Sequence, residues 1–297
     1  GADRVFLFSR YEDDVERDVE LLRRRHPDAI LVFMDWTAPL DLRFAERIGS
    51  AVDVYVKKHW ARSERDAVGP FAGDTNLMSW FGPRYGLDHA RQRWRLPEGF
   101  GEKARVFPGF FTAERLFDAS TRDEPPCLGE GEIDLHAVLT SSGTDWYELM
   151  RRESQRAVES LQCTVHTARA APHVFQRQMQ RSKLCFSPFG YGEVSWRDYE
   201  AVLFGTLLIK PDMSHIASDP DIYEAHETYV PIAWDLSDLE EKIEHYAARA
   251  DERARICRNA FHRIRAYHRD RRFEADWMRG DGVPAASIGA YVGEPPT

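Results

Sequence analysis

Short apolar runs alternate with amphipathic segments through the first third of the chain. Residues 4–9, 29–34 and 52–56 are apolar runs bounded by polar residues, which is typical of buried strands. Between them, residues 13–25 and 40–48 space apolar side chains among charged ones as helices do. This alternation predicts a parallel sheet covered by helices. No GxGxxG follows the first run, so a dinucleotide-binding site has little support.

The same alternation resumes after residues 118–132, a stretch rich in Pro, Gly and acids that has the composition of an inter-domain linker. The later apolar runs predict five further strands at 133–140, 163–167, 184–187, 207–210 and 228–232. Helices are expected between and after them, at 145–161, 172–182, 237–246 and, as a long charged segment, 249–278.

Periodicity weakens between residues 60 and 97, where aromatic and Arg-rich segments surround Gly and Pro. A long loop-rich insertion in an α/β domain is often functional. Its Trp80, Tyr85 and Trp94 are candidates for stacking on sugar rings, and packing in a satellite core is the competing interpretation. Residues 103–111 are expected to form another strand.

Composition narrows the choice of function. The chain has 297 residues, which favours two domains, and it is 43% hydrophobic. A net charge of -9 argues against a broad nucleic-acid footprint. Four widely spaced cysteines without a CxxC pair argue against a disulfide framework or a zinc site, and Cys185 reads as a core residue. No apolar run approaches a membrane span and no signal-peptide pattern opens the sequence, so a cytoplasmic setting is expected.

The most informative stretch is residues 187–212, which reads as a strand end, a Gly-rich turn, a short helix and a second buried strand. A flexible turn that leads into a helix N-terminus can bind an anion. Glu200, one turn further along, could reach a pair of hydroxyls beyond that anion. Together these features suggest a nucleotide diphosphate. The competing interpretation is that Arg197 and Glu200 form a surface pair three residues apart on the helix.

Residues 141–144 form a smaller polar turn before the helix at 145–161. Ser142 in this turn is a second candidate for phosphate binding through backbone amides, although an ordinary helix cap would look the same. Arg151 and Arg152 in the following helix are expected to face solvent, and the alternative is that they face the cleft.

In the first half, polar residues follow the predicted strands, where ligands of open α/β sheets bind. They are residues 9–11, Asp35-Trp36 and 57–59. Asp35 stands between Met34 and Trp36, and an apolar setting can raise a carboxylate pKa toward the range of a general base. Hydrogen bonding, helix capping or pairing with a nearby lysine is the competing interpretation of Asp35.

These features resemble GT-B glycosyltransferases, and the stretch from Gly190 to Ala201 looks like the donor-binding element of exostosin-like and family-1-like members. The resemblance covers about residues 133–245 and rests on an ordered set of residues: Pro188, Gly190, Gly192, Arg197, Glu200, Ala201 and Gly205 before an apolar strand. It implies an α/β fold of two Rossmann-like domains facing a cleft. We expect an acceptor-side domain at 1–120, a nucleotide-sugar-binding domain at 133–280 and a tail at 281–297.

The resemblance also implies roles for individual residues. Arg197 would neutralise the diphosphate and Glu200 would bind the donor ribose. The other donor-side residues that it implies, or that the turns suggest, are Gly190, Tyr191, Gly192, Glu193, Ser142, Thr228 and Tyr229. Many retaining members space two glutamates as E-x7-E, whereas Glu193 and Glu200 are one residue closer. Retention and inversion therefore both stay open. If the reaction inverts, Asp35 is the expected base and His59 the alternative.

The sequence thus predicts a glycosyltransferase that transfers a hexose or a pentose from a nucleotide-sugar donor. The expected acceptor is a glycan or glycoconjugate, and the expected process is polysaccharide biosynthesis. UDP or GDP is the expected nucleotide. No metal or other cofactor is expected, because no DxD-type motif stands where a metal-dependent enzyme needs it. Peripheral membrane association through a lipid-linked acceptor fits this function. The alternatives are a nucleotide-sugar epimerase or phosphorylase-like enzyme and a non-catalytic sugar- or nucleotide-binding module of a larger protein.

Overall fold

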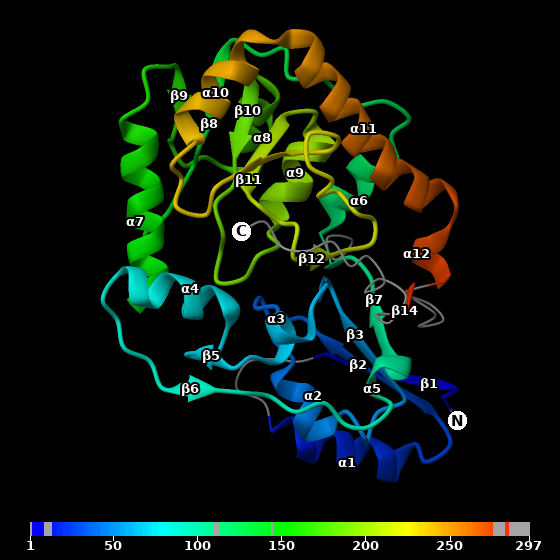
Figure 1. Ribbon diagram of the computed structural model, residues 1–297. Coiled ribbons are helices and arrows are strands. Elements are labelled where there is room, and N and C mark those ends of the chain that lie inside the picture. Colours follow the sequence, from blue (N-terminus) through cyan, green and yellow to red (C-terminus); the bar gives the residue numbers. More distant parts are fainter. Residues whose placement is uncertain (1, 9–13, 110–112, 144, 276–282, 285–297) are drawn as a thin grey trace. The chain divides into compact units, whose positions relative to one another are not determined.

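Two five-stranded sheets organise the chain, one in each of two units (Figure 1). The structure is a computed structural model that describes residues 2–8, 14–109, 113–143, 145–275 and 283–284. The first unit comprises Gly1–Gly109, His215–Asp219 and Arg271–Thr297, and the second comprises Phe110–Ser214 and Pro220–Asp270. The chain therefore returns to the first unit twice after leaving it.

The sheet of the first unit has the order β1-β2-β3-β7-β14. Its strands are β1 (Arg4–Phe8), β2 (Ile30–Asp35), β3 (Val54–Lys57), β7 (Ala104–Val106) and β14 (Val283–Pro284). The first four are parallel, and β14 is antiparallel to β7 at the edge. Parallel strands need cover on both faces, which explains why β2 is apolar from Ile30 to Met34. Its residues Val32 and Met34 pack with Val56 and Phe107 on one face.

Helices α1 (Val15–Arg25) and α2 (Arg43–Ile48) connect the first three strands. The segment with weak periodicity contains several short elements. They are β4 (Trp60–Ala61), α3 (Glu64–Val68), β5 (Phe71–Ala72), α4 (Asn76–Arg84), β6 (Arg91–Gln92) and α5 (Phe100–Lys103). Strands β5 and β6 form an antiparallel pair, and β4 pairs with β12 (Ile216–Ala217), which comes from far along the chain.

The sheet of the second unit is parallel throughout, in the order β13-β11-β10-β8-β9. Its strands are β8 (Ile133–His136), β9 (Val165–His166), β10 (Ser182–Phe186), β11 (Leu207–Pro211) and β13 (Val230–Ile232). Each lies where the apolar pattern predicts a strand, with bounds that differ by a few residues. Cys185 is fully buried in β10, as predicted.

The helices of this unit are α6 (Glu114–Ser120), α7 (Asp145–Glu159), α8 (Pro172–Gln180), α9 (Trp196–Phe204), α10 (Leu239–Ala248) and α11 (Ala250–Arg269). Leu184 and Phe186 of β10 share a core with Ile243 of α10 and Ile256 of α11. Because side chains alternate along a strand, residues such as His136 lie on the opposite face, where His136 contacts Phe175 of α8.

Most predicted elements are confirmed, including the α/β class. The expected boundaries at residues 120 and 133 fall inside the second unit, because α6 packs against α9 and α11. Short helix α12 (Arg272–Glu274) opens the last segment of the first unit. The predicted tail lies outside the described residues except for β14, as do residues 9–11. No helix in the described part of the chain is both long and apolar enough to cross a bilayer.

Candidate functional site

The Gly-rich turn follows β10 and leads into α9, at the carboxyl edge of the second sheet. Within the turn, the Gly190 amide donates to the Gly192 carbonyl at 3.0 Å. Tyr191 is 42% exposed and its ring lies 5.6 Å from that of Trp146 and 5.9 Å from that of Tyr147, both on α7. The turn therefore presents an aromatic ring beside backbone amides at a position where open α/β sheets bind ligands.

Two arginines lie next to this turn. Arg197, in the first turn of α9, donates to the Val138 carbonyl at 2.6 Å. Arg151 of α7 is buried and donates to the carbonyls of Thr140, at 2.9 Å, and Phe189, at 3.3 Å. The prediction that Arg151 faces solvent is therefore wrong. Burial lowers the pKa of Arg151 to about 10; Tyr147 opposes this shift in part, and the positive charge of Arg197 adds a smaller lowering effect.

Neither arginine forms an ion pair with a carboxylate of the described residues; the groups they bond are backbone carbonyls. The Arg197 Nε–H is buried and has no hydrogen-bond partner among the described residues. Arg151 is buried and Arg197 is half-buried. A guanidinium that is removed from water without a carboxylate partner is costly unless an anion binds it. The cluster is suited to an anion such as a phosphate.

His136, at the end of β8, belongs to the same cluster and was not predicted from the sequence. Its ring packs 5.6 Å from that of His166 and 4.8 Å from that of Phe175. Both ring nitrogens are buried without a hydrogen-bond partner among the described residues. Burial, with the positive charge of Arg197 second, lowers the pKa of His136 to about 3, so the ring is neutral near pH 7.

Glu200 lies one turn beyond Arg197, and the two do not pair. The Glu200 carboxylate instead accepts a hydrogen bond from Arg115 of α6. The Arg115 guanidinium also lies 6.0 Å from the centre of the ring of Trp196, which is 51% exposed. Glu193, the other glutamate of the motif, is fully buried. The competing interpretation, a surface pair between Arg197 and Glu200, is therefore wrong: Arg197 bonds the Val138 carbonyl and Glu200 bonds Arg115.

The remaining donor-side candidates have other surroundings. Ser142 is exposed in the turn before α7. The Thr228 hydroxyl closes the turn 224–228, since it accepts from the Glu224 amide at 2.8 Å and donates to the carbonyl of the same residue at 3.2 Å. The Tyr229 hydroxyl is buried and accepts from the Met213 amide at 2.9 Å. The structure gives Thr228 and Tyr229 roles within the fold, and their donor contacts stay predictions.

In the first unit, Asp35 is fully buried at the end of β2. Its Oδ1 accepts from the Thr37 amide and hydroxyl, at 3.1 and 2.6 Å, and its Oδ2 accepts from Tyr55, at 2.6 Å, and Lys57, at 2.9 Å. Burial alone would raise the pKa of Asp35, but the Lys57 charge and these hydrogen bonds together lower it. The expected rise is therefore wrong, because four donors stabilise the charged form.

His59 lies between β3 and β4 and is fully buried. Lys57, the last residue of β3, is fully buried in its pair with Asp35. Of the aromatic residues between 60 and 97, Trp80 is 38% exposed, Tyr85 stacks on Phe81 at 6.1 Å, and Trp94 lies 5.6 Å from the Arg43 guanidinium.

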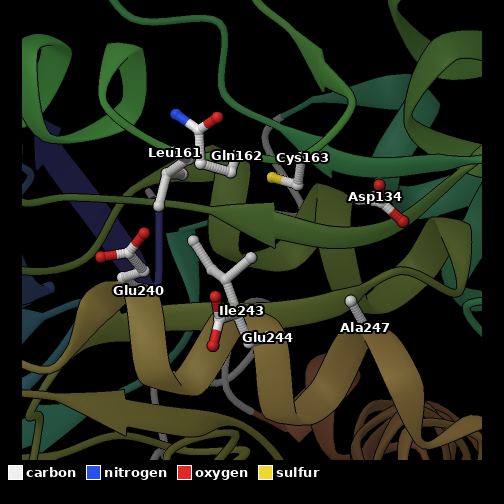
Figure 2. A pocket seen from close by; sticks show the side chains of 8 residues that line it. All are labelled: Asp134, Leu161, Gln162, Cys163, Glu240, Ile243, Glu244 and Ala247. Carbon is white, nitrogen blue, oxygen red and sulfur yellow. The ribbon is translucent and has the colours of Figure 1, made fainter.

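A pocket of about 110 Å³ lies elsewhere in the second unit (Figure 2). It is lined by Asp134, Leu161, Gln162, Cys163, Glu240, Ile243, Glu244 and Ala247. Residues 161–163 precede β9 and Asp134 lies early in β8, so this pocket is near the amino ends of the strands. Arg151 and Arg197 lie instead at the carboxyl edge, where they bond carbonyls of residues that follow β8 and β10.

Comparisons with known proteins concern the second unit and the fold of the chain. Residues 132–277 match the family described as glycosyl transferase-like. No curated protein matches the chain by sequence. Among solved structures, TarM is similar with a TM-score of 0.51 and 10% identity, over 86% of this chain and 50% of TarM. An alpha-glucosyltransferase, AGT, in complex with UDP aligns over 92% of this chain and 80% of its own, with a TM-score of 0.47 and 8% identity.

The likeness to TarM confirms the predicted GT-B fold. The chain spans about half the length of TarM. The family match covers the whole of the second sheet and the Gly-rich turn, which is the part of the chain on which the sequence resemblance rests.

Proposed function

We propose that the chain is a glycosyltransferase, because residues 132–277 match a glycosyl transferase-like family and the fold is similar to that of TarM. It transfers a sugar from a nucleotide-sugar donor to a hydroxyl of a glycan or glycoconjugate acceptor. The donor binds at the carboxyl edge of the second sheet, at the Gly-rich turn and the first turn of α9.

The observation that carries this proposal is the pair of arginines without a carboxylate partner in the described part of the chain. Arg151 and Arg197 donate hydrogen bonds to backbone carbonyls, so their guanidinium groups are oriented before any ligand binds. A guanidinium in such a position suits the oxygens of a diphosphate. The amides at the start of α9 add a favourable dipole for the same anion.

The Gly-rich turn supports the same site. Gly190 has an ordinary backbone conformation, and a Cβ added there would meet no heavy atom closer than 3.5 Å. The fold itself therefore does not require glycine at this position. Close approach of a ligand to the backbone would explain the absence of a side chain.

The chemistry follows from the charges. In the transfer, the bond between the sugar C1 and the diphosphate oxygen breaks, and the nucleoside diphosphate keeps the electron pair. A bond from the acceptor oxygen to C1 forms, and the hydroxyl proton is released. Arg197 and Arg151 stabilise the charge that develops on the diphosphate, which is the role that a metal ion has in other enzymes. We therefore propose a metal-independent reaction.

Asp35 is a weaker candidate for the acceptor base than the sequence indicated, because its four hydrogen bonds favour the ionised form and occupy both oxygens. The base role of Asp35 or His59 stays a prediction. So do UDP or GDP as the nucleotide, polysaccharide biosynthesis as the process and a cytoplasmic setting with peripheral attachment to a lipid-linked acceptor.

Nucleotide binding tests the site directly. We expect UDP or GDP, in a thermal-shift screen with CMP and ADP, to raise the melting temperature, since a ligand that binds the folded state stabilises it. Arg151→Gln and Arg197→Gln should each weaken diphosphate binding about tenfold or more while affecting the nucleoside less. Arg152→Gln is the matched control, because Arg152 is the exposed neighbour of Arg151 and pairs with Glu148 on the same helix. Equal affinities in all three variants would reject the site.

Product analysis separates the alternatives. Release of nucleoside diphosphate only when an acceptor is present indicates transfer. Isomerisation of the donor alone indicates an epimerase, and tight binding without turnover on any acceptor indicates a binding module.

A further inference from the structure

The carboxylate of Asp198, in the first turn of α9, is the centre of a buried hydrogen-bond network. Its Oδ1 accepts from the hydroxyls of Ser187, at 2.6 Å, and Ser195, at 3.0 Å. Its Oδ2 accepts from the Ser195 amide, at 2.9 Å, and the Tyr223 hydroxyl, at 2.8 Å. The Lys210 ammonium lies 3.3 Å from Oδ1 and 3.2 Å from Oδ2. Four segments of the second unit therefore meet at one carboxylate.

This network joins the two ends of the Gly-rich turn. Ser187 and Ser195 stand at the two ends of residues 188–194, and their hydroxyls are 3.3 Å apart on the same carboxylate oxygen. Glycines at 190 and 192 allow the turn many conformations, so its shape depends on how its ends are held. The Asp198 carboxylate fixes the distance between those ends.

Lys210 supports the arrangement from β11. It is fully buried, donates to the Ser187 carbonyl at 3.4 Å and lies 5.4 Å from the ring of Phe189, inside the turn. Its ion-pair partner among the described residues is Asp198. A buried ion pair contributes little net stability compared with apolar residues of the same volume, but it can select one conformation.

We propose that Asp198 is a positioning residue that holds the Gly-rich turn in its donor-binding shape by joining Ser187 to Ser195, with Lys210 and Tyr223 orienting the carboxylate. The inference rests on the proposed function, since the purpose of the turn is donor binding. An ordinary helix cap would need only the Ser195 contacts. The Ser187, Lys210 and Tyr223 contacts extend the network to both ends of the turn and to two other segments.

The test uses two mild variants, Ser187→Ala and Tyr223→Phe, each of which removes one hydroxyl from Asp198. Thr206→Val is the matched control: it removes a buried hydroxyl that donates to the Met179 carbonyl at 2.7 Å, at the opposite end of α9. Amide hydrogen exchange of residues 187–195 is measured without nucleotide. We expect faster exchange in the two test variants and unchanged exchange in the control. Unchanged exchange in Ser187→Ala and Tyr223→Phe would overturn the proposal.

The second measurement is affinity for UDP and GDP by calorimetry and, where transfer is found, the donor KM. Each test variant should raise the Kd and the donor KM about five- to tenfold, the effect of one hydrogen bond, and leave the acceptor KM unchanged. Thr206→Val should bind as the unmodified protein does even if it melts as early as the test variants. Test variants with unmodified affinity would overturn the donor-binding purpose. An unmodified protein that binds no nucleotide would overturn the proposed function, while the exchange result would still decide whether Asp198 holds the turn.

Discussion

The Arg115 guanidinium of α6 donates a hydrogen bond to the Glu200 carboxylate of α9. The side chain of Glu200 is 7% exposed and that of Arg115 is 44% exposed, so the pair lies at the edge of the buried region. The carboxylate that is expected to receive the ribose hydroxyls therefore already has a cationic partner. Glu200 can accept hydrogen bonds from Arg115 and from ribose hydroxyls at the same time, because a carboxylate offers about four lone-pair positions.

Glu200→Gln should weaken nucleotide binding by about 10- to 100-fold, because it replaces a charged acceptor of ribose hydroxyls, worth ~1.5–3 kcal/mol, by a neutral amide. Calorimetric titration with UDP and GDP measures the effect. Glu132→Gln, which removes the surface pair with Arg181, should have no effect on affinity. Unaltered affinity of a folded Glu200→Gln protein would remove the ribose assignment.

Asp35→Asn should destabilise the first unit by about 3–5 kcal/mol, because it leaves the buried Lys57 charge without its partner. Urea unfolding measures this, and Asp35→Asn/Lys57→Met should recover part of the loss. The folded pKa of Asp35 is below its ordinary value of 3.8, so its contribution is complete above that pH and is lost as the pH falls through the folded value. A loss of less than 1 kcal/mol in the single variant would contradict the pairing.

His136 should make the protein sensitive to acid. Its pKa is about 3 in the folded protein and 6.5 as an ordinary value, so the unfolded chain binds the extra proton between these limits. Stability that is complete above pH 6.5 should therefore fall by about 1.4 kcal/mol per pH unit on acidification. His136→Phe keeps an aromatic ring beside Phe175 but cannot bind the proton. Between pH 7 and 5, its free energy of unfolding should fall by about 2 kcal/mol less than that of the unmodified protein. Parallel pH profiles in urea unfolding would rule out this role of His136.

Gly205 ends α9 with φ of 77°, and a Cβ there would lie 1.9 Å from the Cys127 carbonyl oxygen. Gly205→Ala should therefore lower the melting temperature far more than Gly86→Ala, where φ is 71° but no atom lies within 4 Å of the added Cβ. The control should lose only the cost of the left-handed backbone, about 1–2 kcal/mol. Similar melting temperatures for the two variants would show that the chain moves aside at Cys127.

Strands and most helices could be predicted because their patterns are local. Apolar runs such as 29–34 and 207–210 mark buried parallel strands wherever they stand in the sequence. The short elements between residues 60 and 97 escaped prediction because two-residue strands such as β5 have no period. The two residues of strand β12 also form no periodic pattern, and the strand is defined by its pairing with β4.

The turn and Arg197 could be located from the sequence, but their partners could not. Arg151 is separated from Phe189 by 38 residues, and Arg115 from Glu200 by 85, so neither contact leaves a local signal. One sign was present for Arg151: it stands three and seven residues before Ser154 and Val158, on the buried face of α7. The environment of Asp35 was misjudged because its sequence neighbours are apolar, whereas its contacts include Tyr55 and Lys57 on the adjacent strand.

The pairing of β12 with β4 limits how the chain can be divided. The gene segment that encodes the second sheet also encodes residues 215–219, which fold with the first unit. A fragment covering 133–280 alone would carry Ile216 and Ala217, both buried in the intact protein, without the strand that covers them. Exchange of the second unit between related proteins would therefore succeed only if the segment around β4 were exchanged together with it.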